Sequence, residues 1–507
     1  MAARAPDQAP ARSPRLTALE LADLVLDAGS FSRWDSELAA PRAADETYTA
    51  ELAAARDRTG LDEAVVTGEG RIHGRRVAVL ACEFGFLAGS IGVATAERLV
   101  LAIERATAEG LPLLAAPASG GTRMQEGAVA FLQMVKITVA VTKHRAAGLP
   151  YLVYLRSPTT GGVLASWGSL GHVTAAEPGA TIGFLGSRVY QALHGTPFPE
   201  GVQVAENLHA HGLIDAVVPA EDLAGITAAA LDVMTAPRTD LPTVPLPADL
   251  EIADTPAWES IERTRRRDRP GVKALLRAAA TSVTPLEGTG QGEQDAGLLV
   301  TLARFGSAPC VLLGQDRDSQ ASRPIGPAGL REARRGLRLA GELGLPLVTI
   351  VDTPGAELSR EAEEGGLAGE IARCLSDMVM LPAPTVCVLL GQGCGGAALA
   401  LLPADRVLCA EHGWLSPLPP EGASTILYRT VDRAPEVARR QGVRSRDLLS
   451  SGIVDRIVPE RPDAADEPEP FLRRIGQVLE HELVQLLGQQ PAVRLATRHE
   501  RYRRLGL

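Results

Sequence analysis

Short apolar runs alternate with longer stretches of helical periodicity along most of the chain. The runs RVAVLAC (76–82), LPLLAAP (111–117) and PYLVYLR (150–156) are apolar on both faces, whereas ATAERLVLAIERATAEG (94–110) has a helical apolar period and ends at a glycine of the kind that caps helices. Strands that are buried on both faces are typical of mainly parallel sheets covered by helices. The pattern therefore predicts an α/β protein built from β-α-β units.

The same order of motifs occurs twice. The segment GLPLLAAPASGGTRMQEG parallels GLPLVTIVDTPGAELSREAEEGG and places Pro112 against Pro346, a shift of 234 residues (346 − 112). The shift persists between Pro150 and Pro384 (384 − 150 = 234), and both copies close on similar segments, HGLIDAVVP and SGIVDRIVP. A unit of roughly 150 residues is too long for a solenoid repeat. The sequence therefore predicts a duplicated domain.

Composition divides the chain into two domains and a connector. Residues 1–15 are expected to form a disordered tail, and residues 16–236 and 257–507 the N-terminal and C-terminal domains. The segment between them, 237–256, is rich in proline and acidic residues, as is typical of an extended linker. The stretch AWESIERTRRRDRPGVKALLRAA is expected to open the second domain as a helix, with its arginines on a solvated face.

The charge balance narrows the range of partners. The 507 residues include 51 Lys and Arg against 61 Asp and Glu, a formal net charge of −10, which argues against binding to nucleic acid or to an anionic membrane. No run reaches the ~18 apolar residues of a membrane span, and the basic start lacks the apolar stretch of a secretory signal. The six cysteines lack the spacing of a zinc ribbon or a disulfide framework. We expect a cytoplasmic protein.

A pair of adjacent glycines follows the same strand in each copy. Gly161–Gly162 and Gly395–Gly396 both begin 11 residues after the proline that opens the preceding apolar run (161 − 150 and 395 − 384). The first amides of a helix lack acceptors within it and lie at the positive end of its dipole, so they can stabilise an oxyanion. Glycine also lets a substrate approach the backbone. One such pair is more often a turn or a packing feature, but two matched pairs indicate two oxyanion sites.

Side-chain chemistry is harder to find. Cys394 in GQGCGG is interpreted as a small packing residue rather than a nucleophile, because the first copy has Thr160 there. His172 is matched by Arg406 and is interpreted as a core or loop residue rather than a base. The run VTKHRAAG (141–148) either contacts phosphate or forms a solvated helix end. With no metal set, P-loop or acid–base pair in view, the chemistry is expected to depend on backbone donors and on a cofactor brought by another protein.

At these positions the chain resembles a known family. In the first copy TGLDEAVVTGEGRIHGRRVAV, SGGTRMQEG, TTGGVLASWGSLG and AEPGATIGF are similar to the beta subunit of bacterial acetyl-CoA carboxylase carboxyltransferase. In the second, VDTPGAE, EEGGLAGEIAR, GQGCGGAALAL and GIVDRIVPE resemble the alpha subunit. The resemblance covers residues 16–220 and 290–460. It implies one fused carboxyltransferase chain with two homologous crotonase-like β-β-α spiral domains in tandem.

The resemblance implies transfer of CO₂ from carboxybiotin, held on a separate carrier protein, to an acyl-CoA thioester. The freed ureido group takes the α-proton, and the enolate captures CO₂. Because the thioester oxygen and the ureido oxygen both become oxyanion-like, two holes are needed. The resemblance assigns Gly161 and Gly162 to the thioester, and the stretch Gly395, Gly396 and Ala397 to biotin. The repeat register favours the first two amides of that stretch, and motif alignment favours the last two.

Further residues and partners follow from the resemblance. Gly120, Gly121 and Arg123 are expected to contact CoA. The family places CoA on the first-type domain and biotin on the second, with sites built between protomers, which implies a homodimer or a larger assembly. The chain shows neither a biotinylation motif nor a biotin carboxylase domain, so a biotin carboxyl carrier protein and a biotin carboxylase are expected as separate partners. Beta subunits usually carry a four-cysteine zinc ribbon, but none precedes Cys82, so no zinc is expected.

The paired alpha-like and beta-like halves favour acetyl-CoA as the substrate and malonyl-CoA as the product, in fatty acid biosynthesis. Propionyl-CoA or another acyl-CoA is the nearest alternative, and a biotin-dependent decarboxylase shares the fold. A crotonase-type hydratase or isomerase is more distant, because it normally needs well-placed carboxylates beside the hole. A subunit that only binds acyl-CoA is the alternative outside catalysis.

Overall fold

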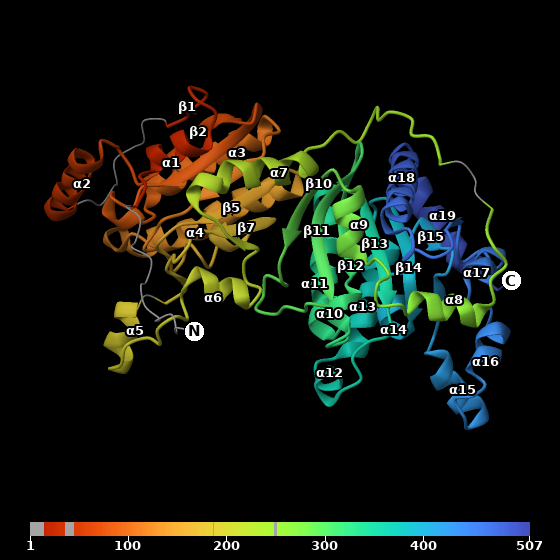
Figure 1. Cartoon of the computed structure of the whole chain (residues 1–507). Coiled ribbons are helices and arrows are strands. Elements are labelled where there is room, and N and C mark those ends of the chain that lie inside the picture. The colour runs from red at the N-terminus through yellow and green to blue at the C-terminus, as the bar shows by residue number, and fades with distance from the viewer. Residues whose placement is uncertain (1–14, 36–44, 186, 248–250, 507) are drawn as a thin grey trace, which may run out of the picture. The chain divides into compact units, whose positions relative to one another are not determined.

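The computed structural model describes residues 15–35, 45–185, 187–247 and 251–506. The chain divides into two compact units (Figure 1): unit 1 comprises Met1–Ala210 and Ile214–Ala228, and unit 2 comprises His211–Leu213 and Ala229–Leu507. The predicted tail, 1–15, lies outside the described residues except for its last position. The predicted domain limits stay predictions, and this division assigns the proposed linker, 237–256, to unit 2.

The strands of unit 1 are β1 (Ser32–Arg33), β2 (Val65–Ile72), β3 (Arg75–Cys82), β4 (Leu113–Ala116), β5 (Tyr151–Leu155), β6 (Thr159–Thr160), β7 (Val173–Ala176), β8 (Ile182–Gly183) and β9 (Ala216–Val217). A seven-stranded sheet has the order β1-β2-β3-β4-β5-β7-β9, and β6 and β8 form a separate pair. The first three strands are antiparallel and the pairs from β3 to β9 are parallel. The mainly parallel sheet confirms the prediction from the apolar runs.

The helices in this part of the chain are α1 (Ala18–Val25), α2 (Glu46–Thr59), α3 (Val93–Ala108), α4 (Gly127–Ala146), α5 (Ser187–His194), α6 (Ala205–Ala210) and α7 (Leu223–Met234). Helices α3 and α4 connect β3 to β4 and β4 to β5, the predicted β-α-β wiring. Helix α3 stops where the sequence suggests, because Gly110 has φ +66° and the next amide, of Leu111, donates to the carbonyl of Ala106 at 2.8 Å.

The strands of unit 2 are β10 (Ser282–Leu286), β11 (Leu298–Phe305), β12 (Ala308–Gln315), β13 (Leu347–Thr353), β14 (Thr385–Cys394), β15 (Arg406–Ala410), β16 (Trp414–Ser416) and β17 (Arg456–Val458). They form an eight-stranded sheet in the order β10-β11-β12-β13-β14-β15-β17, with β16 paired to the end of β14. The sequence β11-β12-β13-β14-β15-β17 repeats β2-β3-β4-β5-β7-β9 in order and direction. The duplication seen in the sequence is therefore a duplication of the fold.

The helices of unit 2 are α8 (Ala257–Thr264), α9 (Val272–Ala279), α10 (Arg317–Gln320), α11 (Pro327–Leu343), α12 (Arg360–Glu364), α13 (Leu367–Met380), α14 (Gly395–Leu399), α15 (Pro420–Tyr428), α16 (Ala434–Gln441), α17 (Ser445–Ser450), α18 (Pro468–Leu487) and α19 (Pro491–Arg504). The stretch predicted as a helical entry to the second domain is helical, but it folds as two helices, α8 and α9, with a turn between them. Pro270 lies in that turn, and proline disfavours helical conformation in the residue before it.

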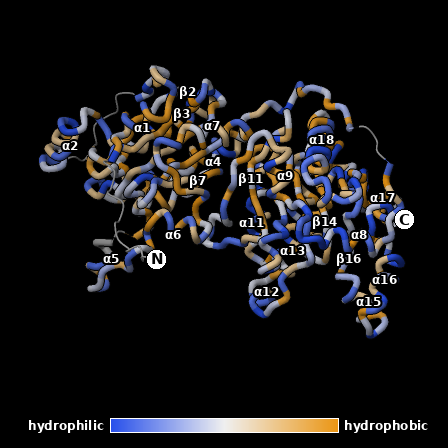
Figure 2. Tube along the Cα trace, viewed as in Figure 1, coloured by the Kyte–Doolittle hydropathy of each residue, from blue (hydrophilic) through white to orange (hydrophobic). Residues whose placement is uncertain are grey.

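Each unit has its own core between its sheet and its helices. In Figure 2 the hydrophobic colour follows the strands of each unit. In unit 1, side chains of β3, β4 and β5 pack with those of α3 and α4. In unit 2, side chains of β12, β13 and β14 pack with those of α9 and α18. Buried area of this kind supplies most of the folding free energy, and it holds the carboxyl ends of the parallel strands in fixed positions.

The helix α19 is fixed to unit 2 through a buried arginine. Arg498 is fully buried, and its Nε and one terminal nitrogen donate to the carboxylate of Asp405 at 2.8 and 2.7 Å. The terminal nitrogens also donate to the carbonyls of Met378, Leu381 and Ala383, at the end of α13 and just before β14. One guanidinium therefore joins α19 to α13 and to the segment that leads into β14.

We expect Arg498→Met to destabilise unit 2 by about 3–5 kcal/mol, because it removes the hydrogen-bonded partner of the buried Asp405 and leaves only the longer 3.6 Å pair with Arg494. Arg504→Met is the matched control, since Arg504 forms an exposed pair with Glu500 one helical turn away, worth less than about 0.5 kcal/mol. Urea unfolding followed by circular dichroism measures both. Equal free energies of unfolding for the two variants would contradict this account of α19.

Candidate active site

The first glycine pair follows β6, which is paired with β8. Gly161 has φ +63°, a left-handed conformation that favours glycine. Its amide donates to the carbonyl oxygens of Gly183 and Phe184 at 3.2 and 3.0 Å. Within the part of the chain that the structure describes, the amides of Gly162 and Val163 have no hydrogen-bond acceptor. The amide of Gly161, which the sequence nominates as a donor, is therefore already engaged, and the free donors begin at Gly162.

Gly120 and Gly121, in the loop after β4, lie beside the junction at Gly161 and Gly162. The amide of Gly120 donates to the carbonyl of Ala88 at 2.9 Å, and that of Gly121 to Oγ of Ser119 at 3.0 Å. Gly121 has φ +107°, and a Cβ built on it would stand 3.6 Å from the amide nitrogen of Gly162. The two predicted sets of glycines thus come together, and the missing side chain of Gly121 keeps the space beside a free amide open.

Arg123 lies in the same loop but is fully buried. Its terminal nitrogens donate to the carboxylate of Glu63 at 3.0 and 2.6 Å, and one of them also donates to the carbonyl of Ser90 at 2.7 Å and to Oγ1 of Thr95 at 3.1 Å. A further terminal bond reaches Tyr48, and Nε donates to Oγ of Ser90. All donors of this guanidinium are engaged within unit 1. Its position favours a role in fixing the loop over the predicted direct contact with CoA.

The second glycine pair opens α14, directly after β14. Gly395 has φ +65°, close to that of Gly161, and the end of β14 pairs with β16 as β6 pairs with β8. The first amides of a helix have no acceptor within it. By this match Gly396 and Ala397 are the counterparts of Gly162 and Val163. The free donors of unit 1 begin one residue later than the sequence suggested. With that correction, the repeat register selects Gly396 and Ala397, the same two amides that the motif alignment favours.

The side chains singled out in the sequence do not supply reactive groups at these junctions. Cys394 is buried among apolar residues such as Trp414, and burial raises the pKa of its thiol to about 11. His172 is buried, and its Nδ1 accepts the amide of Tyr151 at 3.0 Å. In the run 141–148, burial lowers the pKa of His144 to about 4. Among the residues described by the structure, no three His, Cys, Asp or Glu side chains gather as a metal site.

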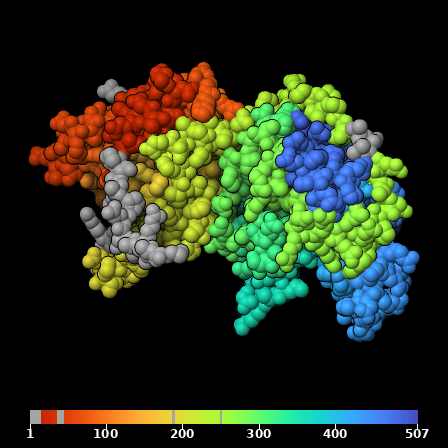
Figure 3. All heavy atoms as spheres, in the orientation of Figure 1, coloured from red at the N-terminus to blue at the C-terminus, as the bar shows by residue number. Residues whose placement is uncertain are grey.

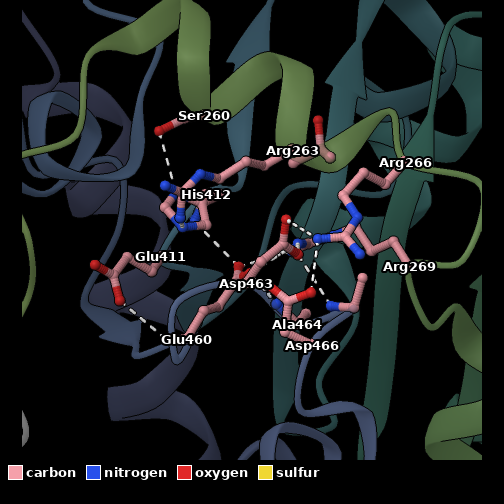
Figure 4. A network of polar contacts seen from close by, with 12 residues as sticks. Ser260, Arg263, Arg266, Arg269, Glu411, His412, Glu460, Asp463, Ala464 and Asp466 are labelled. Atoms are coloured by element: carbon pink, nitrogen blue, oxygen red, sulfur yellow. Dashed lines mark hydrogen bonds and ion pairs between the residues drawn. The ribbon is translucent and has the colours of Figure 1, made fainter.

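A buried network of charges supports β14 (Figure 4). Arg269 forms two hydrogen bonds of 2.7 Å with the carboxylate of Glu460, and neither side chain is exposed. Arg269 also donates to the carbonyl of Leu390 on β14 at 3.0 Å, and the amide of His412 donates to Glu460 at 3.1 Å. Although burial pushes the pKa of Glu460 up, Arg269 holds it below its ordinary value. The pair therefore stays ionised and ties β14 to the segment after β17.

This network corrects the interpretation of the arginine run as a solvated helix face. The helix ends before Arg269, and the turn directs that side chain into the interior, where Glu460, 191 residues further along, neutralises it. Arg266 does remain partly exposed, in contact with Asp268 and Asp466. A partner so distant in the sequence leaves no local signal.

Two polar side chains near α14 were not predicted. Gln315 and Asp352 are fully buried near the carboxyl ends of β12 and β13. Carboxyl ends of parallel strands are where α/β proteins place their sites. The signal was present in the sequence, because each residue follows an apolar run, VLLG and LVTIV, that is otherwise without strongly polar side chains.

Comparison with known proteins places these features in a family. The family described as "Carboxyl transferase domain" matches residues 11–493. A "Probable biotin-dependent acyl-coenzyme A carboxylase beta3 subunit" of Mycobacterium tuberculosis is 60% identical over 494 residues, which cover 97% of this chain and 99% of that protein. "Acetyl-coenzyme A carboxylase carboxyl transferase subunits beta/alpha" of Salinispora tropica is 39% identical over 477 residues, 90% of this chain and 84% of that protein.

Solved structures agree on the fold. A transcarboxylase 12S structure, described as a hexamer assembly with hydrolysed methylmalonyl-coenzyme A bound, superposes with a TM-score of 0.72 at 22% identity and covers 92% of this chain and 88% of that chain. A single-chain, multi-domain long-chain acyl-CoA carboxylase superposes with a TM-score of 0.69 at 19% identity, over 90% of this chain and 46% of that one. With its two tandem crotonase-like units, the chain therefore belongs to the carboxyl transferase family of biotin-dependent acyl-CoA carboxylase subunits.

Proposed function

We propose that the chain transfers a carboxyl group from carboxybiotin, carried on a separate protein, to acetyl-CoA, which gives malonyl-CoA for fatty acid biosynthesis in the cytoplasm. One observation carries the proposal. Each unit ends a parallel strand at a left-handed glycine that is followed by two amides available to an oxyanion. The reaction needs two such sites, because negative charge develops on the thioester oxygen and on the ureido oxygen.

In unit 1 the amides of Gly162 and Val163 hold the thioester oxygen. As the α-proton leaves, negative charge grows on that oxygen, and donors already aimed at it stabilise the charge without reorganising. Gly121 keeps the approach to the Gly162 amide clear, since its would-be Cβ lies 3.6 Å from that nitrogen. Gly161 supplies the left-handed turn, and Arg123 holds the adjoining loop in place.

In unit 2 the amides of Gly396 and Ala397 serve the ureido oxygen. Carboxybiotin supplies the carboxyl group and, after its release, the base that accepts the α-proton. The residues of the chain fit this group, because they offer backbone donors at the positive end of α14. The neighbouring thiol of Cys394 stays neutral, since burial raises its pKa to about 11, so it does not compete for the carboxyl group.

The relatives support an acyl-CoA substrate and separate partner subunits. The relative that is 60% identical is named for an unspecified acyl-coenzyme A, and the one that is 39% identical is named for acetyl-coenzyme A. Carboxylation of propionyl-CoA or a longer acyl-CoA at the same site is therefore the second candidate. Because both names describe subunits, we propose a biotin carboxyl carrier protein and a biotin carboxylase as the partners.

We also propose that the chain works as a homodimer or a larger assembly. Exposed apolar side chains stand at equivalent positions of the two units, separated by the repeat shift of 234 residues (358 − 124, 418 − 184 and 427 − 193). The pairs are Met124 and Leu358, Phe184 and Leu418, and Leu193 and Leu427. In unit 2 the segments around α12 and α15 project from the body (Figure 3). Exposed apolar side chains at the same positions of both units support an interaction surface on each unit.

Helix α4 adds a second apolar surface beside Gly162. Its exposed apolar side chains are Val129, Phe131, Leu132, Val135 and Val139. By length and composition alone the stretch Met124–Ala146 could cross a membrane. However, Ile137 and His144 are buried in unit 1, and Lys136 forms an ion pair with Glu97 of α3. Helix α4 is thus part of the folded unit, and we propose that a second copy of the chain covers its open face.

Proline at position 162 tests the oxyanion donors. Gly162→Pro removes one N–H, whereas Gly162→Ala keeps it, and the glycine does not adopt a left-handed φ that either residue would resist. We expect Gly162→Pro to lower kcat for carboxyl transfer by about 10²-fold or more, and Gly162→Ala to lower it much less. Ala397→Pro and Ala397→Gly form the equivalent pair in unit 2. Acetyl-CoA binding, measured by calorimetry, reports on folding. A folded Gly162→Pro variant as active as Gly162→Ala would contradict the assignment.

A substrate panel separates the candidate reactions. With a carboxybiotin donor, we expect kcat/KM to be highest for acetyl-CoA among acetyl-, propionyl- and longer acyl-CoAs. A clear preference for propionyl-CoA or a longer chain would move the proposal to the second candidate. Hydration of crotonyl-CoA without biotin, or no transfer to any acyl-CoA, would overturn carboxyl transfer itself.

Sedimentation tests the assembly. We expect the chain to sediment as a dimer or larger species, and Leu358→Glu with Leu427→Glu to shift it toward the monomer and to reduce carboxyl transfer, because charges would be placed in an apolar interface. Leu101→Glu is the control, since Leu101 is exposed on α3 but its repeat equivalent is Arg335. A fully active monomer, or flotation of the chain with anionic lipid vesicles, would contradict the proposal.

A further inference from the structure

We propose that Gln315 is a positioning residue for the oxyanion site of unit 2, which it fixes by joining α14 to β13 through its side-chain amide. The inference rests on the proposed function, because it assigns a purpose to the orientation of the amides of Gly396 and Ala397. Gln315 is the last residue of β12 and is fully buried.

Two hydrogen bonds define the position of Gln315. Its Nε2 donates to the carbonyl of Ala397 at 2.8 Å, and its Oε1 accepts the backbone amide of Asp352 at 3.1 Å. The opposite orientation of the side-chain amide would place two donors against each other at Asp352 and two acceptors at Ala397. The side chain is therefore held in one orientation, with one end on α14 and the other on β13.

The short length of α14 makes this contact consequential. The helix has only five residues, and the amide of Leu401, four residues after Ala397, donates to Ala398 instead. The carbonyl of Ala397 is thus not held by the helix itself and is bound by Gln315. Ala397 therefore carries a proposed oxyanion donor on its nitrogen and the Gln315 bond on its oxygen. A displacement of this residue moves the donor directly.

The other end of Gln315 is itself anchored by buried charge. The carboxylate of Asp352 accepts the amide of Gln392 on β14 at 3.0 Å and lies 3.2 Å from a terminal nitrogen of Arg317. Arg317 in turn donates to the carbonyls of Thr264 and Arg266 at 2.9 Å. Gln315 thus connects α14 to a rigid set of contacts that includes the strand leading into α14.

The duplicated unit supplies a comparison within the same chain. Strand β3 is the counterpart of β12, and its last residue is Cys82. Cys82 is fully buried, but a thiol is a weak donor and cannot bridge two backbone groups as an amide does. The bridge that the side chain of Gln315 forms between α14 and β13 is therefore not a requirement of the shared fold. It is present in the unit that we assign to biotin, and a thiol replaces it in the unit that we assign to acyl-CoA.

Two variants of the full-length chain test the inference by transfer of a carboxyl group from malonyl-CoA to free biotin. Gln315→Met keeps the unbranched shape and removes both hydrogen bonds. We expect it to lower kcat by about tenfold or more, below the ~10²–10³ cost of removing an oxyanion donor itself. The Kd for malonyl-CoA, which binds unit 1, should stay within twofold. Cys82→Ala is the matched control and should keep the wild-type kcat.

Gln315→Glu gives a pH signature that a purely structural role would not produce. Burial raises the pKa of a carboxyl group, so this one should protonate above its ordinary range. Protonated, it can donate to Ala397 and accept from Asp352 as glutamine does, whereas ionised it repels the Ala397 carbonyl. Activity relative to the wild type should therefore rise as the pH falls. The charged groups around position 315 are Asp352, Arg317 and Arg269, and the ion pair of Asp316 with Lys273. The variant and the wild type share these groups, so the ratio of the two activities cancels the effect of their titration.

The outcomes separate this inference from the proposed function. A wild-type chain without transfer activity would overturn the proposed function and the inference with it. An active wild type, together with a Gln315→Met variant that keeps its kcat, would overturn the inference alone. If Gln315→Met does not fold, the ratio of Gln315→Glu to wild type decides, and a ratio that does not change with pH overturns the inference. An equal loss of kcat and of malonyl-CoA binding would show a general structural role instead.

Discussion

A backbone N–H without an acceptor is the feature on which the proposed chemistry depends. Such groups are costly in a protein interior, and this chain keeps them at two equivalent places, directly after a left-handed glycine. The left-handed turn places the amide of Gly161 against β8 and leaves the next two amides free. In unit 1 the amides follow β6, which is paired with β8, and in unit 2 they open α14 at the end of β14, so both sets are held in place before any ligand arrives.

The two units support these amides differently. In unit 1 glycines bring the loop after β4 close to Gly162, and the buried Arg123–Glu63 pair fixes that loop. In unit 2 polar side chains support the amides: Gln315 binds α14, and the Arg269–Glu460 pair supports β14. Breaking a buried ion pair is costly, so both pairs restrict how the active-site segments move. The duplication preserved the backbone geometry, while the surrounding side chains diverged.

The sequence predicted the duplicated α/β fold and the glycine junctions, because both leave local and periodic signals. It did not predict which amides are free, since that depends on the pairing of β6 with β8, whose two residues each carry little pattern. It misplaced Arg269 on a solvated face and did not predict that Arg123 is buried, because the partners Glu460 and Glu63 are distant in the sequence. It also missed Gln315, because the apolar run before it marks a polar strand end but does not reveal its two partners, the carbonyl of Ala397 and the amide of Asp352.

A crystal structure of the chain with acetyl-CoA and biotin bound tests the central claim most directly. The account predicts the thioester oxygen at about 2.7–3.1 Å from the amide nitrogens of Gly162 and Val163, and the ureido oxygen at a similar distance from those of Gly396 and Ala397. It also predicts that the two ligands meet where unit 1 of one copy faces unit 2 of another. Either oxygen bound by a side chain or by solvent, with these amides turned into the protein interior, would contradict it.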